Sequence, residues 1–159
     1  MAVKVNWKLL AVCVGIPLAV GVLAGLLTRS GMENFQMVTQ PPLSPPAWVF
    51  PVVWTILYVL MGIGSYLVLV SGGDAREKRR AMTAYAVQLG MNFLWPLFFF
   101  GLGWYLFSLF WLAGMWIAVL VTMVRFYRIE NRAGDLLLPY LLWLTFAGHL
   151  NFGVYLLNR

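Results

Sequence analysis

Charged residues are scarce in this 159-residue chain: Asp, Glu, Lys and Arg fill 10% of positions, whereas 62% are hydrophobic. A soluble domain of this length cannot bury so large an apolar fraction, so the composition places the chain in a lipid bilayer. The eleven basic and five acidic residues give a net charge of +6. They cluster between apolar runs instead of forming one compact basic face, so we expect no nucleic acid partner.

Residues that carry catalysis or bind metals are also few. The single cysteine, Cys13, lies inside an apolar run, cannot form an internal disulfide, and is interpreted as a small buried hydrophobe. The single histidine, His149, has no second histidine and no cluster of Cys, Asp or Glu around it, so we predict no metal site. The sequence contains no P-loop and no nucleophile elbow. We therefore predict no required cofactor.

Five apolar segments are long enough to cross a bilayer, which requires about 20 helical residues. They predict an all-α integral membrane protein, a single domain over residues 1–159 built as a bundle of five transmembrane helices. The predicted spans cover residues 6–28, 47–70, 81–101, 104–126 and 134–156, and a lid loop covers residues 29–46. No charged residue lies at the middle of a span, which argues against a proton relay or an ion-coupled pump.

The basic residues predict the orientation of this bundle. With five spans, nine of the eleven fall on one side of the membrane, and only Arg29 and Arg159 fall on the other. Because cytoplasmic loops carry the excess of Lys and Arg, we predict a cytoplasmic N-terminus in a bacterial cell membrane. The lid loop and the C-terminus then face outward.

The third predicted span carries two side-chain amides in an apolar setting. Gln88 and Asn92 are four residues apart and therefore share one face of the helix, with Tyr85 and Trp95 nearby at offsets of three. Amides inside a bilayer are costly unless they meet a partner or a ligand. They either bond neighbouring helices or mark a binding site, and their spacing leaves both interpretations open.

The stretch from Pro41 to Tyr58 contains five prolines within eleven residues. Proline fixes φ and lacks a backbone donor, so this stretch predicts a stiff, extended segment that ends at the start of a helix. It delivers Trp48 and Trp54 to the mouth of that helix. The two tryptophans are explained either by the aromatic belt of the membrane interface or by an aromatic-lined pocket for a flat apolar ligand.

The same stretch resembles the signature of the TspO/MBR family, which comprises the tryptophan-rich sensory proteins of bacteria and the mitochondrial translocator protein. The resemblance spans nearly the whole chain, and its motifs agree in order and spacing. It is carried by Pro45 to Pro51 with Trp54, Thr55, Leu57 and Tyr58, by Met61 to Val68, by Gln88, Leu89, Asn92 and Trp95, and by Leu138 to Trp143 with Ala147, Leu150 and Asn151.

Members of this family bind porphyrins such as protoporphyrin IX, and some bind cholesterol or benzodiazepine-type drugs, in a five-helix bundle capped by the first loop. The resemblance thus implies a receptor or sensor in tetrapyrrole regulation or transport, and a homodimer. It implies stacking by Trp54 and Trp143, a hydrogen bond from Asn92, and room for close approach at Ala147. The implied ligand-binding residues are Trp54, Asn92, Trp95, Trp143 and Ala147, with Tyr58, Gln88 and Trp48 as lesser candidates.

The lid loop departs from the family pattern. Asn34 and Phe35 stand where relatives usually carry Trp-Tyr, and Gln40 to Leu43 stand where relatives carry Lys-Pro-x-Trp. The lid thereby loses two indoles, one phenol hydroxyl and one positive charge. We expect a changed ligand affinity or selectivity.

Two alternative functions and one weak motif accompany this interpretation. Some relatives degrade protoporphyrin under light, which would make the chain an enzyme that requires Trp54 and Trp143. A small transporter has little support, because the sequence has no inverted repeat. Leu150, Tyr155 and Arg159 fit a loose sterol-contact pattern that many helix ends match by chance.

Overall fold

The computed structural model describes residues 4–159, and within that range its regular structure is entirely helical. This confirms the predicted all-α class. The elements are α1 Trp7–Leu27, α2 Arg29–Phe35, α3 Val49–Val70, α4 Ala75–Pro96, a π-helix η1 Leu97–Gly101, α5 Tyr105–Ile129, α6 Asn131–Asp135 and α7 Leu138–Leu157.

Four helical segments within residues 4–159 are long and apolar enough to cross a membrane. They are Trp7–Leu27, Val49–Val70, Tyr105–Ile129 and Asn131–Leu157. Each corresponds to one of the spans predicted from the sequence. The fifth predicted span, residues 81–101, falls on α4 and η1, and its crossing of the membrane stays a prediction.

Helix α4 begins six residues before the predicted span, at Ala75. The Asp74 carboxylate accepts hydrogen bonds from the backbone N–H groups of Arg76 and Glu77, at 3.0 and 3.1 Å, and so caps this start. The charged residues that hydropathy assigns to a loop therefore form the first turns of α4. At the other end the α-helix stops at Pro96 and continues as the π-helix, which divides the predicted apolar span into two helix types.

The predicted lid loop, residues 29–46, is partly helical, which corrects the sequence-based expectation. Its first seven residues form α2, where Arg29 pairs with Glu33 at 3.7 Å across one turn. This spacing suits a short surface helix that hydropathy alone does not reveal. An irregular segment follows from Gln36 and reaches α3 at Val49. From here on, the lid means residues 36–46.

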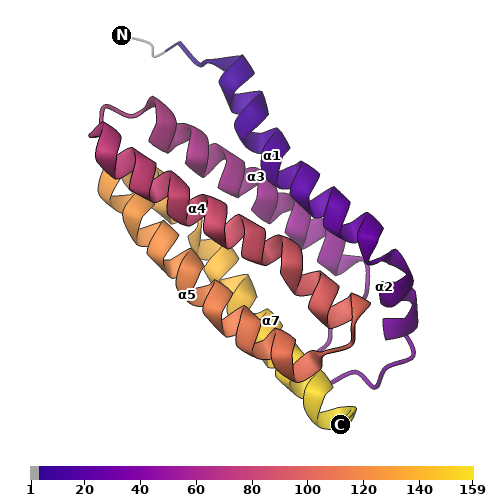
Figure 1. Ribbon diagram of the computed structural model, residues 1–159. Coiled ribbons are helices and arrows are strands. Elements are labelled where there is room, and N and C mark those ends of the chain that lie inside the picture. The colour runs from indigo at the N-terminus through magenta and orange to yellow at the C-terminus, as the bar shows by residue number, and fades with distance from the viewer. Residues whose placement is uncertain (1–3) are drawn as a thin grey trace.

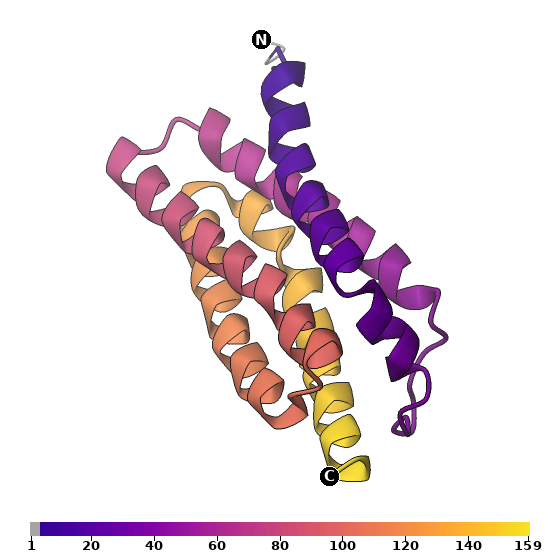
Figure 2. The ribbon, with the colours of Figure 1, turned by 45° about the vertical axis from the view of Figure 1, so that its right-hand side comes forward.

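The long helices form one bundle, in which α1 packs on α3, α4 on α5, and α5 on α7 (Figures 1 and 2). One end of the bundle carries the N-terminus and the start of α4, whereas the other carries α2, the lid and the C-terminus (Figure 1). Helices α1 and α3 approach closely at Gly62, where a Cβ atom would collide with the backbone of Cys13 and Val14. The absence of a side chain at Gly62 is what allows this close approach.

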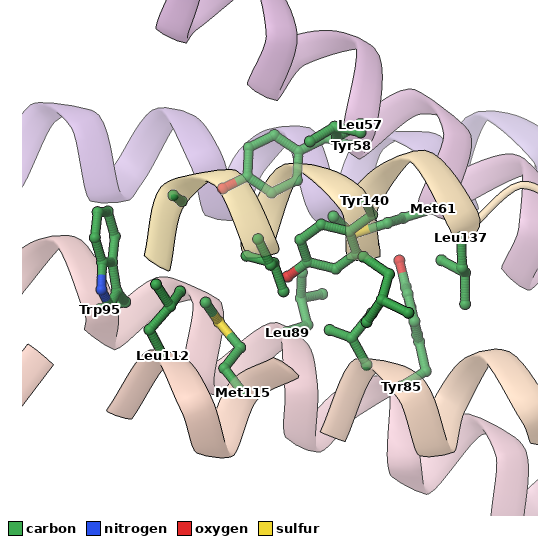
Figure 3. Packing of buried hydrophobic residues seen from close by; sticks show 14 of the residues in the cluster. Leu57, Tyr58, Met61, Tyr85, Leu89, Trp95, Leu112, Met115, Leu137 and Tyr140 are labelled. Atoms are coloured by element: carbon green, nitrogen blue, oxygen red, sulfur yellow. The ribbon is translucent and has the colours of Figure 1, made fainter. Parts of the chain in front are cut away.

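The core runs through the middle of the bundle as a row of buried side chains from α3, α4, α5 and α7 (Figure 3). Met61 and Met115 are fully buried in it, and Leu144 is 1% exposed. Three tyrosines, Tyr58, Tyr85 and Tyr140, enter the same row and bring hydroxyl groups into an otherwise apolar interior (Figure 3). The placement of these hydroxyls defines the candidate site.

Candidate ligand-binding site

The Asn92 side chain lies at the centre of the candidate site and joins three helices. The Tyr58 hydroxyl on α3 donates to Asn92 Oδ1 at 2.7 Å, and Asn92 Nδ2 donates to the Tyr140 hydroxyl oxygen on α7 at 2.6 Å. All three side chains are at least nine-tenths buried. We call Tyr58, Asn92 and Tyr140 the tyrosine–amide centre. Its two hydrogen bonds offset the free-energy cost of burying the Asn92 amide in an apolar interior.

Trp54 forms an aromatic wall beside this centre. It lies one turn before Tyr58 on α3, and the two rings stack with centroids 5.6 Å apart and planes 29° apart. Its edge-on contact with Tyr140 has a centroid distance of 6.0 Å. Both are favourable aromatic arrangements. Trp54, predicted as a stacking residue, is therefore brought into contact with both tyrosines of the centre.

Trp143 and Ala147 extend the site along α7. They follow Tyr140 at offsets of three and seven, which places all three on one helical face. The Trp143 ring meets Phe50 at 5.9 Å and Phe146 at 5.4 Å between centroids. Its indole nitrogen is buried and has no hydrogen-bond partner within residues 4–159. Ala147 is 8% exposed, and its small side chain takes up little space on this face of α7.

Gln88 lies one turn before Asn92 and is fully buried. Its Nε2 lies 3.9 Å from the sulfur of Met61, a weak acceptor, and its Oε1 has no partner among the described residues. The Tyr85 hydroxyl is likewise buried without a partner in residues 4–159. This face of α4 thus keeps unused hydrogen-bonding capacity next to the tyrosine–amide centre.

Trp95 belongs to a second polar network, centred on Asn151. The Trp95 indole N–H donates to Asn151 Oδ1 at 3.3 Å, and the Ser108 hydroxyl donates to the same oxygen at 3.2 Å. Asn151 Nδ2 donates to the backbone carbonyl of Tyr105 at 2.8 Å. The Trp95 ring stacks on Phe99 with centroids 4.9 Å apart. Its indole N–H is therefore engaged in tying α4, α5 and α7 together.

The remaining predicted residues lie away from the tyrosine–amide centre. Trp48, at the start of α3, is 67% exposed, as a residue of an interfacial belt would be. In the sterol-contact pattern Leu150 is buried in the bundle, whereas Arg159 is exposed. The three residues of that pattern thus lie in different surroundings.

Two open grooves lie elsewhere on the surface. One, of about 280 Å³, lies between α5 and α7 and includes Trp116 and Thr145. The other, of about 380 Å³, lies between the lid and the end of α7. None of the residues that line these two grooves is a predicted ligand-binding residue. At the centre itself, Trp54 packs on both Tyr58 and Tyr140.

Sequence reasoning did not assign a role to Tyr140 or Asn151. Both fall in the motifs that carry the family resemblance, and both are polar groups inside a long apolar segment. That second feature is the signal that could have identified them, because a polar group in an apolar span needs a partner. The partners themselves come from other helices and become visible only in the fold.

Comparison with known proteins places this chain in a family. The chain matches the TspO/MBR family over residues 13–157. The chain belongs to the TspO/MBR family. It is 37% identical to the Tryptophan-rich protein TspO of Chlorobaculum tepidum over 150 residues, which cover 94% of this chain and 95% of the relative. TspO/MBR membership and the apolar helices together make it a membrane protein.

Other TspO/MBR relatives carry different names. The chain is 36% identical to the bovine Translocator protein over 149 residues, covering 91% of this chain and 86% of the relative. It is 38% identical to the Tryptophan-rich sensory protein of Cereibacter sphaeroides over 126 residues, covering 79% and 77%. The family resemblance read from the sequence is therefore confirmed.

Proposed function

We propose that the protein is a membrane receptor or sensor for porphyrins of the protoporphyrin IX type, and that it acts in tetrapyrrole regulation or transport. The bundle has five membrane spans: the four long apolar segments and, third in chain order, a span formed by α4 and η1. The N-terminus faces the cytoplasm of a bacterial cell, and the lid faces outward. The positions of the basic residues support this orientation, because Arg76 and Arg128 lie at the N-terminal end of the bundle and Arg159 at the other (Figure 1).

One observation carries the proposal: the buried indole N–H of Trp143 has no hydrogen-bond partner within residues 4–159. An unpaired buried donor costs about 1–3 kcal/mol, so a ligand acceptor that reaches it recovers that cost. The same helical face carries Tyr140 and the small Ala147, and Trp54 supplies a second aromatic wall. Aromatic walls with a few polar groups suit a flat apolar ligand that carries polar edges.

The test is a titration of the purified protein with protoporphyrin IX in the dark, followed by quenching of tryptophan fluorescence. We expect saturable quenching that weakens in Trp143→Phe. Trp104→Phe is the matched control, because Trp104 is 53% exposed and packs on Phe98 and Phe107, away from the tyrosine–amide centre. Quenching that never saturates, or that weakens equally in both variants, would overturn the proposal.

The second candidate function is light-dependent degradation of a bound porphyrin. Trp54 touches both tyrosines of the centre, so a light-excited ligand at the centre would lie against oxidisable aromatic rings. Illumination of the complex would then produce new absorption bands that disappear in Trp54→Phe with Trp143→Phe. An unchanged rate in that double variant would exclude the enzymatic function for these residues.

We also propose a homodimer. Ala86 and Gly90 lie on an exposed stripe of α4, and a Cβ atom at Gly90 would meet nothing within 4 Å. Small residues at this spacing let a second helix approach closely in a membrane. Gly90→Leu should lower the dimer fraction in a cross-linking assay, while Gly72→Leu, in an open turn after α3, should leave it unchanged.

A further inference from the structure

Helix α2 and the lid that follows it touch the bundle at two places that differ in kind. At the end of α2, Phe35 packs on Phe99 and Phe100 of the π-helix, with centroids 5.2 and 5.1 Å apart. Gly31 of α2 lies directly against the Phe100 backbone, where any Cβ atom would collide. This first contact is a packed aromatic anchor. It uses Phe35, which lies directly before the lid and is one of the residues that depart from the family pattern.

The second contact consists of hydrogen bonds to the last turn of α7. The Thr39 backbone N–H donates to Asn158 Oδ1 at 3.0 Å, and Asn158 Nδ2 donates to the Thr39 carbonyl at 2.9 Å. One amide side chain thus hydrogen-bonds both the N–H and the carbonyl of Thr39, in the same way that a residue of a neighbouring β-strand would pair with it. The two segments are 119 positions apart in sequence.

Asn158 is itself held in place. Its backbone N–H donates to the Val154 carbonyl at 3.1 Å, and its side-chain Nδ2 donates to the same carbonyl at 2.8 Å. The amide is therefore oriented toward Thr39 by the end of α7. Beside it, Pro41 sits on Gly153, where a Cβ atom would lie 2.5 Å from the proline ring. Gly153 is the residue that lets the lid come this close.

Packing around this second contact is incomplete. The groove of about 380 Å³ lies between the same two segments, lined on the lid side by Pro41 to Leu43 and on α7 by residues that include Phe152 and Leu156. The two Asn158–Thr39 hydrogen bonds are exposed, so water competes for both groups. Leu43 has a φ of +69°, a left-handed conformation that a branched side chain rarely adopts.

We propose that Asn158 is a latch that holds the lid closed over the bundle, and that its release controls how fast a ligand enters and leaves. The aromatic anchor at Phe35 stays in place while residues 36–46 swing away from α7. The part of this inference that concerns ligand exchange rests on the proposed function. The role of Asn158 in holding the lid closed does not rest on it, because opening of the lid can be measured without a ligand.

The ligand-free test is amide hydrogen exchange of the full chain in nanodiscs, read at residues 36–46. In Asn158→Ala we expect the Thr39 amide to exchange about tenfold faster or more, because its acceptor is lost. Gly153→Ala should have a similar effect, because its methyl group pushes Pro41 away. Gln40→Ala is the control, since within the described chain the Gln40 amide donates to the carbonyls of Phe35 in α2 and Val38 in the lid, and not to α7. Unchanged exchange at Thr39 in Asn158→Ala would overturn the latch.

The ligand test follows the dissociation of protoporphyrin IX by the recovery of tryptophan fluorescence after dilution. The latch predicts faster dissociation in Asn158→Ala, by about tenfold, with association accelerated to a similar degree and the affinity little changed. A lower affinity at an unchanged association rate would show that Asn158 contacts the ligand and would overturn the latch. If no variant binds protoporphyrin IX while Thr39 exchange still responds, the proposed function fails and the latch stands.

Discussion

The bundle contains two buried asparagines that are used in different ways. Asn151 donates to a backbone carbonyl of α5 and accepts from Trp95 and Ser108, so its partners include a fixed part of a helix. Among residues 4–159, the Asn92 side chain bonds only to the hydroxyl groups of Tyr58 and Tyr140, which rotate about their own side-chain torsions. Of the two amides, Asn92 is the one that can exchange its partners for groups of a ligand without disturbing a helix.

This difference separates a structural amide from a binding amide, although the two look alike in sequence. Each is a polar residue inside a long apolar helix, and each is nine-tenths or more buried. The cost of burial demands a partner in both cases. What distinguishes them is whether that partner belongs to the backbone or to a side chain that a ligand can replace.

The largest effect should come from breaking the structural amide. Asn151→Ala removes its hydrogen bonds to Ser108 and Tyr105 and leaves the buried indole N–H of Trp95 unpaired, so we expect a loss of about 2–3 kcal/mol in the free energy of unfolding. Thermal unfolding in detergent measures it. Ser108→Ala, which leaves the Trp95 and Tyr105 bonds to Asn151 in place, should cost about 1 kcal/mol. Equal stability of the wild type and Asn151→Ala would show that Asn151 is not a structural amide.

Breaking the binding amide should lower the ligand affinity. In Asn92→Ala we expect the affinity for protoporphyrin IX to fall about tenfold, because one hydrogen bond to a buried polar group is lost. The rise in melting temperature that ligand gives to the wild type should shrink accordingly. If Asn151→Ala lost as much ligand affinity as Asn92→Ala, the two amides would not have separate roles.

Trp143→Phe should separate stability from binding. It keeps the aromatic contacts with Phe50 and Phe146 but removes a buried N–H that has no partner within residues 4–159. We expect the stability to stay within about 0.5 kcal/mol or to rise, while the affinity falls about fivefold. Chemical denaturation and the fluorescence titration measure the two quantities. A loss of stability with unchanged affinity would show that Trp143 serves packing alone.

The smallest expected effect is a change in ligand affinity when the Tyr58 hydroxyl is removed. Tyr58→Phe removes the hydroxyl that occupies Asn92 Oδ1, so a ligand N–H reaches that oxygen without competition. We expect about threefold tighter binding of protoporphyrin IX. Weaker binding would mean that the Tyr58 hydroxyl holds Asn92 in the orientation the ligand needs, and Tyr58 would then be a positioning residue.

The sequence predicts the apolar part of this fold well and its polar details poorly. Helices α1, α3, α5 and α7 coincide with long apolar runs, because crossing a membrane requires both length and apolar composition. The start of α4 was missed because its first turns are charged, although Asp74 followed by Glu77 at the third helical position is an N-terminal signature. The short α2 and the π-helix carry no apolar period that could predict them.

The sequence suggests candidate residues for the site but not the contacts that join them. The stripe of Gln88 and Asn92 follows from helical spacing, and Trp54 and Trp143 follow from the family resemblance. Their partners cannot be read from spacing, because Tyr140 reaches Asn92 across 48 positions of sequence and Asn158 reaches Thr39 across 119. Only the packing of the bundle shows that Trp95 turns its indole N–H to Asn151.

The most direct test of the contrast between the two amides is nuclear magnetic resonance of the asparagine side chains, labelled with nitrogen-15, during a titration with protoporphyrin IX. The Asn92 and Asn151 signals are assigned from their absence in Asn92→Asp and Asn151→Asp. We predict that the Asn92 side-chain signals move and saturate with the ligand, while those of Asn151 stay in place. Saturable binding that moves Asn151 and leaves Asn92 unchanged would contradict the account.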